Sequence, residues 1–182
     1  MEKKTQSIGT DHKFRRFITG HNKQGKSIIV SEKQPVEYDV LFDMWRTNSS
    51  PASNTISGDA AGSGPRLEPF QNGTVFRFFQ CNPEDPSLSN EEIEKMRAAR
   101  FAYWEAEHCR PNTTRGPQMH KTKTLDYIIV LEGEVTLLLD EEEVELKPFD
   151  VVIQRGTNHG WINKGSKPAL LAAVMIDAEP LQ

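Results

Sequence analysis

Cysteine is scarce in this chain, which has only Cys81 and Cys109 among its 182 residues. Two distant cysteines exclude the dense disulfide framework of a small secreted scaffold, and they lack the paired spacing of a zinc motif. Long apolar runs are absent as well, because no window approaches the roughly 20 residues that span a bilayer. The N-terminal residues carry charge without the apolar stretch of a signal peptide. These absences predict a cytoplasmic protein with no membrane partner.

Positive charge is not in excess either. The 22 Lys and Arg residues are outnumbered by 26 Asp and Glu residues, which gives a formal net charge of -4 at pH 7. A nucleic-acid-binding protein is expected to present a basic footprint, and the one locally basic stretch, residues 13–26, is interpreted as a solvated surface. We therefore expect a small-molecule substrate as the partner, and no nucleic acid.

The length fits a single domain over residues 1–182, with enough chain to bury a core. We divide it into an N-terminal arm of strands over residues 1–46, a flexible loop over 47–69, and a barrel over 70–182 whose central motifs lie within 116–177. The loop is rich in Ser, Ala, Gly, Asn and Pro, which bury too little apolar surface to offset the entropy of ordering. It is either a lid over a site or a free loop.

Short β-like runs separated by turn residues dominate the chain. Residues 14–20 and 27–30 flank a turn-rich HNKQGK segment and predict an N-terminal hairpin. Residues 36–47 and 74–80 predict further strands, and the second half is a succession of β-branched runs of about five residues. Regular turn spacing without intervening helices predicts an antiparallel sandwich or barrel and excludes a parallel α/β fold.

One helix is predicted in the middle of the chain. Ser89 and Glu92 have the spacing of a capping box. The apolar residues that follow fall within one helical arc, namely Ile93, Met96, Phe101 and Trp104. Arg97 and Arg100 lie inside the same arc, which leaves two interpretations open. Their stems cover apolar surface while their heads reach water, or the two guanidinium groups face an anionic ligand.

The residues most suited to chemistry lie in the second half. His120, Thr122 and Asp126 have the same parity in an extended segment, so their side chains point to one face. His159 opens a second strand-like run, and two histidines with one carboxylate are the ligand set of non-haem Fe(II) sites. We predict His120, Asp126 and His159 as catalytic residues and as ligands of a divalent transition metal, namely Fe, Mn, Ni, Cu or Zn. Without a metal, the same three groups can act as general acid and base.

Four further residues are candidates for binding the substrate. Arg155 and Trp161 share the parity of His159 and offer a carboxylate clamp and a ring for stacking, provided that the turn at Gly156 does not rotate Arg155 away. Thr122 lies on the face of His120. Tyr127 has the opposite parity from its neighbour Asp126, so packing is its first interpretation and substrate contact its second.

This pattern resembles the two motifs of the cupin family. The first family motif is His-x-His, three or four residues, Glu, six residues and Gly, and the second is Gly, two residues, His, three residues and Asn. The chain has His120-Lys121-Thr122, three residues, Asp126, six residues and Gly133, then Gly156, two residues, His159, three residues and Asn163. Thr122 stands where the family usually has its second histidine, and Asp126 stands where it has glutamate.

The whole chain is similar to small single-barrel cupins in its segments RRFITGH, MWRT, GPQMHKTKTLDY and VVIQRGTNHGW. The resemblance implies an all-β, cupin-type antiparallel β-barrel, or jelly roll, with an N-terminal strand arm and one or two short helices. Because the N-terminal strands have edges to cover, we also expect a homodimer.

The leading functional hypothesis is a metal-dependent enzyme acting on a small organic molecule with a carbonyl, enol or phenol group. Oxidative chemistry is favoured because a site of two histidines and one carboxylate leaves room for both substrate and O₂. Some relatives in this resemblance are described as oxidoreductases of natural-product pathways. Two alternatives stay open. One is a non-oxidative dehydratase, isomerase or decarboxylase that uses the same pocket, and the other is a ligand-binding cupin without turnover.

Overall fold

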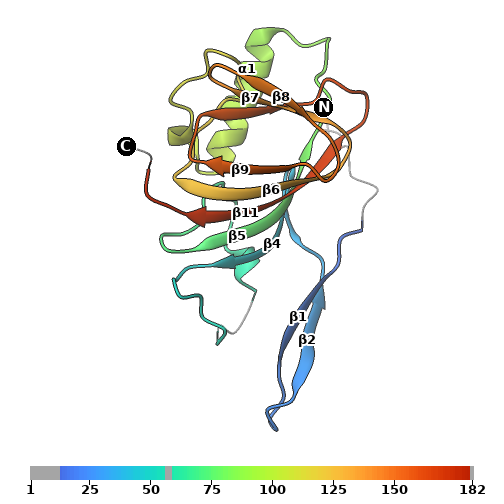
Figure 1. Ribbon diagram of the computed structural model, residues 1–182, viewed down its shortest axis with the longest axis vertical. Coiled ribbons are helices and arrows are strands. Elements are labelled where there is room, and N and C mark those ends of the chain that lie inside the picture. The colour runs from blue at the N-terminus through green and yellow to red at the C-terminus, as the bar shows by residue number, and fades with distance from the viewer. Residues whose placement is uncertain (1–12, 56–58, 181–182) are drawn as a thin grey trace, which may run out of the picture.

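The computed structural model describes residues 13–55 and 59–180 (Figure 1). Its strands are β1 (Arg16–His21), β2 (Ser27–Lys33), β3 (Val36–Tyr38), β4 (Leu41–Thr47), β5 (Thr74–Cys81), β6 (Thr124–Glu132), β7 (Val135–Leu139), β8 (Glu143–Leu146), β9 (Val151–Arg155), β10 (His159–Ile162) and β11 (Ala169–Asp177). Its helices are the 3-10 turns η1 (Ala60–Gly62) and η2 (Glu107–Cys109) and the α-helix α1 (Asn90–Tyr103). No helix within the described residues is long and apolar enough to cross a membrane.

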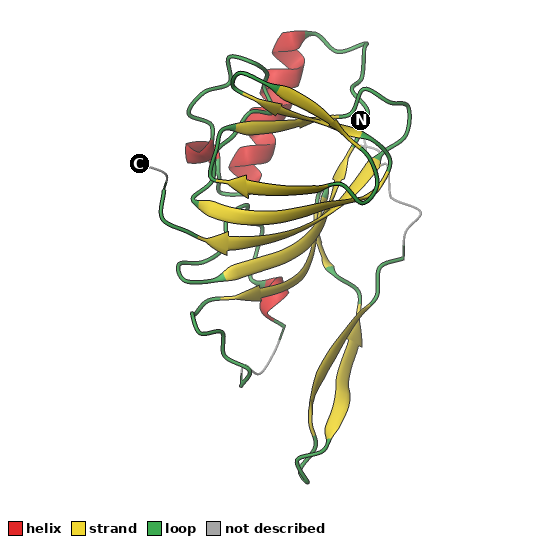
Figure 2. Ribbon diagram, in the orientation of Figure 1, coloured by secondary structure: helices red, strands yellow, loops and turns green. Residues whose placement is uncertain are grey.

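The strands form a barrel of two antiparallel sheets and a separate hairpin. One sheet has six strands in the order β3-β4-β5-β11-β6-β9, and the other has three in the order β10-β7-β8. Figure 2 shows how strands dominate the fold, with α1 beside the barrel and the hairpin β1–β2 projecting away from it. The all-β cupin-type barrel with few helices, predicted from the sequence, is confirmed.

The core lies between the two sheets, and the alternation of buried and exposed residues along β6 shows which face it occupies. Along β6, residues Thr124, Asp126, Ile128 and Val130 are buried, whereas Tyr127 and Ile129 are exposed. Apolar residues of β5, β7 and β11 pack against this inner face of β6 and complete the cluster, among them Val75, Leu137, Leu171 and Ala173. The same alternation therefore builds the core and directs the polar side chains of β6 inward.

Helix α1 closes one side of this interior. Ser89 and Glu92 form the predicted capping box, in which each side chain accepts from the other's main-chain N–H. Phe101 and Trp104 are buried with Tyr38, Leu41 and Leu67 in a second apolar cluster. Met96 departs from the predicted buried arc. It is 53% exposed, so the apolar contacts of the helix are concentrated at its C-terminal end.

The boundaries drawn from the sequence need correction in the first half. The hairpin β1–β2 is a separate arm as predicted, but β4 pairs with β5 inside the six-stranded sheet, so residues 36–47 belong to the barrel. Residues 59–69 are also not a free loop. The Tyr38 hydroxyl donates to the carbonyl of Ala61 and accepts from the N–H of Gly64, and Leu67 is buried.

A buried ion cluster fastens this segment to the sheet. Asp43 of β4 faces Arg77 of β5 in the strand register, and Asp43 Oδ1 lies 2.9 Å from Arg77 Nε. Arg46 Nε donates to Asp43 Oδ2 at 2.6 Å. Both arginines also donate to main-chain carbonyls, from Arg46 to Gly64 and from Arg77 to Arg66 and Leu67. One carboxylate thus organises two guanidinium groups that are about 1% exposed.

Replacing Asp43 with asparagine is expected to destabilise the fold by about 3 to 5 kcal/mol, because it leaves two buried cations without a counter-charge. Urea unfolding at pH 7 would measure the loss. Glu143→Gln is the matched control, since it breaks only the exposed ion pairs with Lys164 and Arg115 and should change stability by less than about 1 kcal/mol. Equal effects of the two substitutions would contradict a central role for the Asp43 cluster.

Candidate functional site

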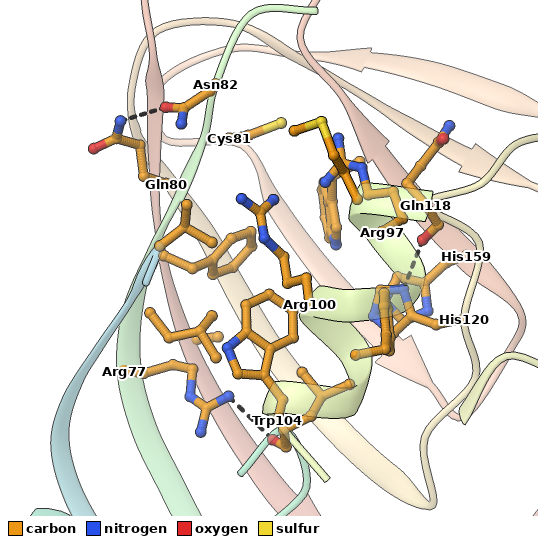
Figure 3. A pocket seen from close by; sticks show the side chains of 18 of the residues that line it. Arg77, Gln80, Cys81, Asn82, Arg97, Arg100, Trp104, Gln118, His120 and His159 are labelled. Atoms are coloured by element: carbon orange, nitrogen blue, oxygen red, sulfur yellow. Dashed lines mark hydrogen bonds between the residues drawn. The ribbon is translucent and has the colours of Figure 1, made fainter. Parts of the chain in front are cut away.

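The interior of the barrel contains a cavity of about 390 Å³. Its walls come from both sheets and from α1, which contributes Phe101. Figure 3 shows Arg97 and Arg100 of α1, and Trp104 at its C-terminal end, beside the two histidines. Five residues that the sequence singled out line it together, namely His120, Thr122, Asp126, His159 and Trp161. The cavity is therefore the place where the predicted chemistry would occur.

The two histidines lie side by side because their main chains pair. His120 N–H donates to the carbonyl of His159 and His159 N–H donates to the carbonyl of His120, both at 2.8 Å. Directly opposite residues of an antiparallel pair project to the same face, and the two imidazole centroids are 4.2 Å apart.

The hydrogen bonds of the rings decide which nitrogen is basic. The Nδ1 of His120 lies 3.0 Å from the carbonyl of Gln118, and the Nδ1 of His159 lies 3.0 Å from the carbonyl of Thr157. A carbonyl oxygen only accepts, so each Nδ1 carries the proton and each Nε2 keeps a lone pair. Burial lowers the pKa of His120 to about 4 and that of His159 to about 3. Both imidazoles are neutral bases at pH 7.

Asp126 contributes the opposite kind of group. Its side chain is 3% exposed, and burial raises its pKa to about 6, against the lowering effects of a hydrogen bond with Thr124 and of the Arg77 charge. Asp126 Oδ1 has no hydrogen-bond partner among the described residues. A carboxyl group with one unsatisfied oxygen and a pKa near neutrality is poised to exchange a proton with a bound molecule.

The residues meet only part of the requirement for the expected metal. Two Nε2 atoms oriented by main-chain carbonyls are suitable ligands. Within the described residues, however, three potential ligands come together elsewhere. The donor atoms of Glu68, His108 and Cys109 lie within 4.8 Å of one another, and these residues do not line the cavity. The expected three-ligand site of His120, Asp126 and His159 is therefore not assembled in this conformation. Aspartate is one methylene shorter than the glutamate of the family motif, and Asp126 is held by Thr124.

Two predicted substrate contacts need correction. Arg155 and Tyr127 are exposed, and neither lines the cavity. The parity argument fails at Arg155 because Gly156 follows with a positive φ of 59°, which breaks the alternation between β9 and β10. Tyr127 lies on the outer face, as its parity indicated. Thr122 and Trp161 do line the cavity, and the Thr122 hydroxyl lies 2.6 Å from that of Thr124.

The sequence reasoning overlooked several residues of the cavity wall. Arg77 has the parity of Val75 and Phe79 in its strand, which was a sufficient signal for an inward position. Gln118 is two residues before His120 and shares its parity. Cys81 ends β5 and also lines the cavity, but no pattern in the sequence indicated this.

Comparison with known proteins gives a consistent picture. Residues 107–176 match the family model described as "Cupin domain". The chain is 42% identical over 181 residues to "Phomopsin biosynthesis cluster protein D" of Diaporthe leptostromiformis, covering 92% of this chain and 80% of that protein. It is 32% identical over 168 residues to "Cupin-domain-containing oxidoreductase srdB" of Neurospora crassa, covering 91% and 74%. It is also 28% identical over 170 residues to "Cupin-domain-containing oxidoreductase virC" of Hypocrea virens, covering 91% and 77%.

The raised pKa of Asp126 predicts a pH-dependent gain from removing its charge. The folded state holds this proton more tightly than the unfolded state, so the buried carboxylate costs stability above pH 6 and the cost fades as pH falls toward 4. A change in pKa from 3.8 to about 6 corresponds to about 3 kcal/mol. Asp126→Asn should therefore be more stable than the wild type by up to about that amount at pH 8, and by much less at pH 4.5.

Urea unfolding of both proteins at several pH values would measure this difference. The histidines titrate equally in both, so their effect cancels. A constant difference between pH 8 and pH 4.5 would show that Asp126 is not the group responsible.

Proposed function

The chain belongs to the cupin family, and on that premise we propose that it is an enzyme of natural-product biosynthesis that transfers protons on a small organic substrate inside the barrel. The observation that carries this proposal is the placement of two neutral imidazoles and one carboxyl group of raised pKa in a single cavity. The place in natural-product biosynthesis is supported by relatives whose names include biosynthesis cluster proteins.

The proposed chemistry uses each group for what its surroundings favour. Asp126, with a pKa of about 6, is the strongest base of the three and accepts a proton from a carbon next to a carbonyl, or from an enol or phenol hydroxyl. The Nε2 lone pairs of His120 and His159 accept hydrogen bonds that orient the substrate, because pKa values of about 4 and 3 make the imidazoles weaker bases than this carboxylate. Asp126 then returns its proton at a second position, which is the core of an isomerase reaction.

A metal-dependent oxidation is the second candidate. The sequence favoured it, relatives carry the name oxidoreductase, and the two Nε2 lone pairs are suitable metal ligands. It takes second place because Asp126 does not join the two histidines within ligand distance of a common ion. A ligand-binding protein without turnover is the third candidate, although simple binding would not require an unsatisfied Asp126 oxygen.

The first candidate predicts exchange of carbon-bound hydrogen with solvent. The protein would be incubated in D₂O with phenylpyruvate and with related carbonyl and phenolic compounds that fit a 390 Å³ cavity. Mass spectrometry would then measure the incorporation of deuterium into each compound. We expect catalysed exchange that Asp126→Asn lowers by about 100-fold or more, the usual effect of removing a general base. Tyr127→Phe is the matched control, since this side chain lies on the outer face.

Elemental analysis and oxygen consumption separate the candidates. Hydrogen exchange that persists after chelation supports the proton-transfer candidate. Oxygen uptake that requires near-stoichiometric bound metal would instead support the oxidative candidate. Binding of these compounds without exchange or oxygen uptake would leave only the ligand-binding protein.

We also propose a homodimer, in which hairpin β1–β2 covers the outer face of β6 and β9 on a second copy. The hairpin projects from its own barrel (Figure 1) and exposes Phe17, Ile28, Ile29 and Val30. The outer face of β6 and β9 exposes Tyr127, Ile129, Val151 and Ile153. Two apolar surfaces on one chain can satisfy each other reciprocally in a two-fold dimer. A cytoplasmic location stays part of the proposal, supported by two cysteines that are buried and free.

Light scattering after gel filtration tests the dimer. The wild type should have twice the chain mass of 20.6 kDa, and Ile29→Asp in the hairpin should shift it to the monomer. Val144→Asp is the control, because this residue is comparably exposed but lies on β8, away from the proposed contact. A wild type of monomer mass would refute the dimer.

A further inference from the structure

The cavity wall contains a guanidinium group that forms no ion pair with the described residues. We infer that the natural substrate carries a carboxylate and that Arg97 binds it. The inference rests on the proposed function in one respect, namely that the cavity is the substrate site, and it adds the chemical class of the substrate and the residue that anchors it.

Three arginines line the cavity, and they differ in their partners. Arg77 is paired with Asp43 at 2.9 Å, and Arg100 Nε lies 2.6 Å from Asp39 Oδ2. Arg97 has no ion pair or side-chain hydrogen bond among the residues that the structure describes. Figure 3 shows Arg97 and Arg100 extending from α1 into the cavity. Arg97 is thus the one cavity arginine of the described chain whose charge is left for a ligand.

The neighbours of Arg97 do not neutralise it. Cys81 lies close enough to interact with its charge, but burial raises the pKa of this thiol to about 11, so it stays uncharged. Glu84 and Asp39 attract Arg97 at longer range, but both carboxylates are exposed to solvent, and Asp39 is paired with Arg100. Asp126 interacts with Arg77 instead. Burial also lowers the pKa of Arg97, with the nearby Arg100 charge acting in the same direction. A desolvated cation of this kind gains much from an anionic ligand.

The position of Arg97 suits an anchor for the reaction. Its charge contributes to the lowered pKa of His120, which places the guanidinium within electrostatic reach of the imidazole pair. Apolar side chains such as Phe79, Ile128 and Trp161 line the same cavity. A carboxylate held at Arg97 would therefore leave the apolar body of the molecule within the cavity that contains His120 and His159.

A carboxylate fits better than a phosphate. The guanidinium fork matches a carboxylate in two parallel hydrogen bonds, and one unpaired cation balances one negative charge. A phosphate ester carries nearly two charges at pH 7, and the cavity wall and mouth already contain the carboxyl groups of Asp126, Glu84 and Asp85.

Equilibrium binding tests the inference without any turnover. The probes are benzoate and phenylacetate, the neutral isostere benzamide, and inorganic phosphate. The readouts are the fluorescence of the cavity residues Trp104 and Trp161 and the NMR signals of arginine Nε–H groups. We expect saturable binding of a carboxylate with a shift of the Arg97 signal. Arg97→Met should weaken carboxylate binding about tenfold or more and leave the affinity for benzamide unchanged. Arg97→Lys should restore carboxylate binding only in part.

Two further variants sharpen the result. Arg155→Met removes an exposed arginine outside the cavity and should leave the affinity for benzoate unchanged. Glu84→Gln removes a negative charge near Arg97 and should tighten benzoate binding severalfold. Urea unfolding of each variant establishes that the fold is intact before affinities are compared.

Clear outcomes would overturn the inference. The inference is wrong if neither carboxylate binds saturably, or if benzoate and benzamide bind with equal affinity. It is also wrong if phosphate binds more tightly than the carboxylates, or if Arg97→Met leaves the affinity for benzoate unchanged. If carboxylates bind through Arg97 but no hydrogen exchange occurs, the proposed reaction is wrong and the proposed carboxylate site stands. If hydrogen exchange occurs at the same rate in Arg97→Met, the proposed reaction stands and the carboxylate site is wrong.

Discussion

The reciprocal main-chain hydrogen bonds between His120 and His159 are the interaction on which the site depends. This bridge joins the segment leading into β6, in the six-stranded sheet, to the first residue of β10, in the three-stranded sheet. It therefore connects the two sheets and sets the distance between the two imidazoles at once. Because the rings are also fixed by carbonyls through Nδ1, neither histidine can turn its basic nitrogen away without losing a hydrogen bond.

Burial acts on the three ionisable groups in opposite directions, and this is what makes them useful together. Removal from water disfavours charge, so it lowers the pKa of each imidazole and raises that of Asp126. In water the carboxyl group is far more acidic than the imidazolium, but in this cavity the order of the two kinds of group is reversed. A proton is then held by Asp126 in preference to either histidine. The barrel interior thereby makes Asp126 the strongest base of the three and keeps both imidazoles uncharged.

Strand parity in the sequence predicted much of the site, and its failures have specific causes. His120, Thr122 and Asp126 share the cavity because the chain from 120 to 126 follows the parity of an extended segment. Arg155 was misplaced because a single positive φ at Gly156 changes the face of the strand. The pairing of Asp43 with Arg77 joins residues 34 positions apart, which no local pattern reveals. Ligand distances between Asp126 and the histidines depend on strand packing, so motif spacing could not decide whether a metal site is assembled.

The arginines of the cavity wall show how structural and functional charges can be told apart. Arg77 and Arg100 each have a carboxylate partner outside the cavity lining, Asp43 and Asp39, and with these partners they fasten β5 to β4 and α1 to the loop before β4. Arg97 has the same chemistry without such a partner, and removing it would break no ion pair of the described fold. A partly buried cation without an ion pair has a desolvation cost that an anionic ligand would offset. Arg97 is a different residue from His120, Asp126 and His159 within the one cavity, so the proposed recognition of an anion and the proposed transfer of a proton would use separate groups.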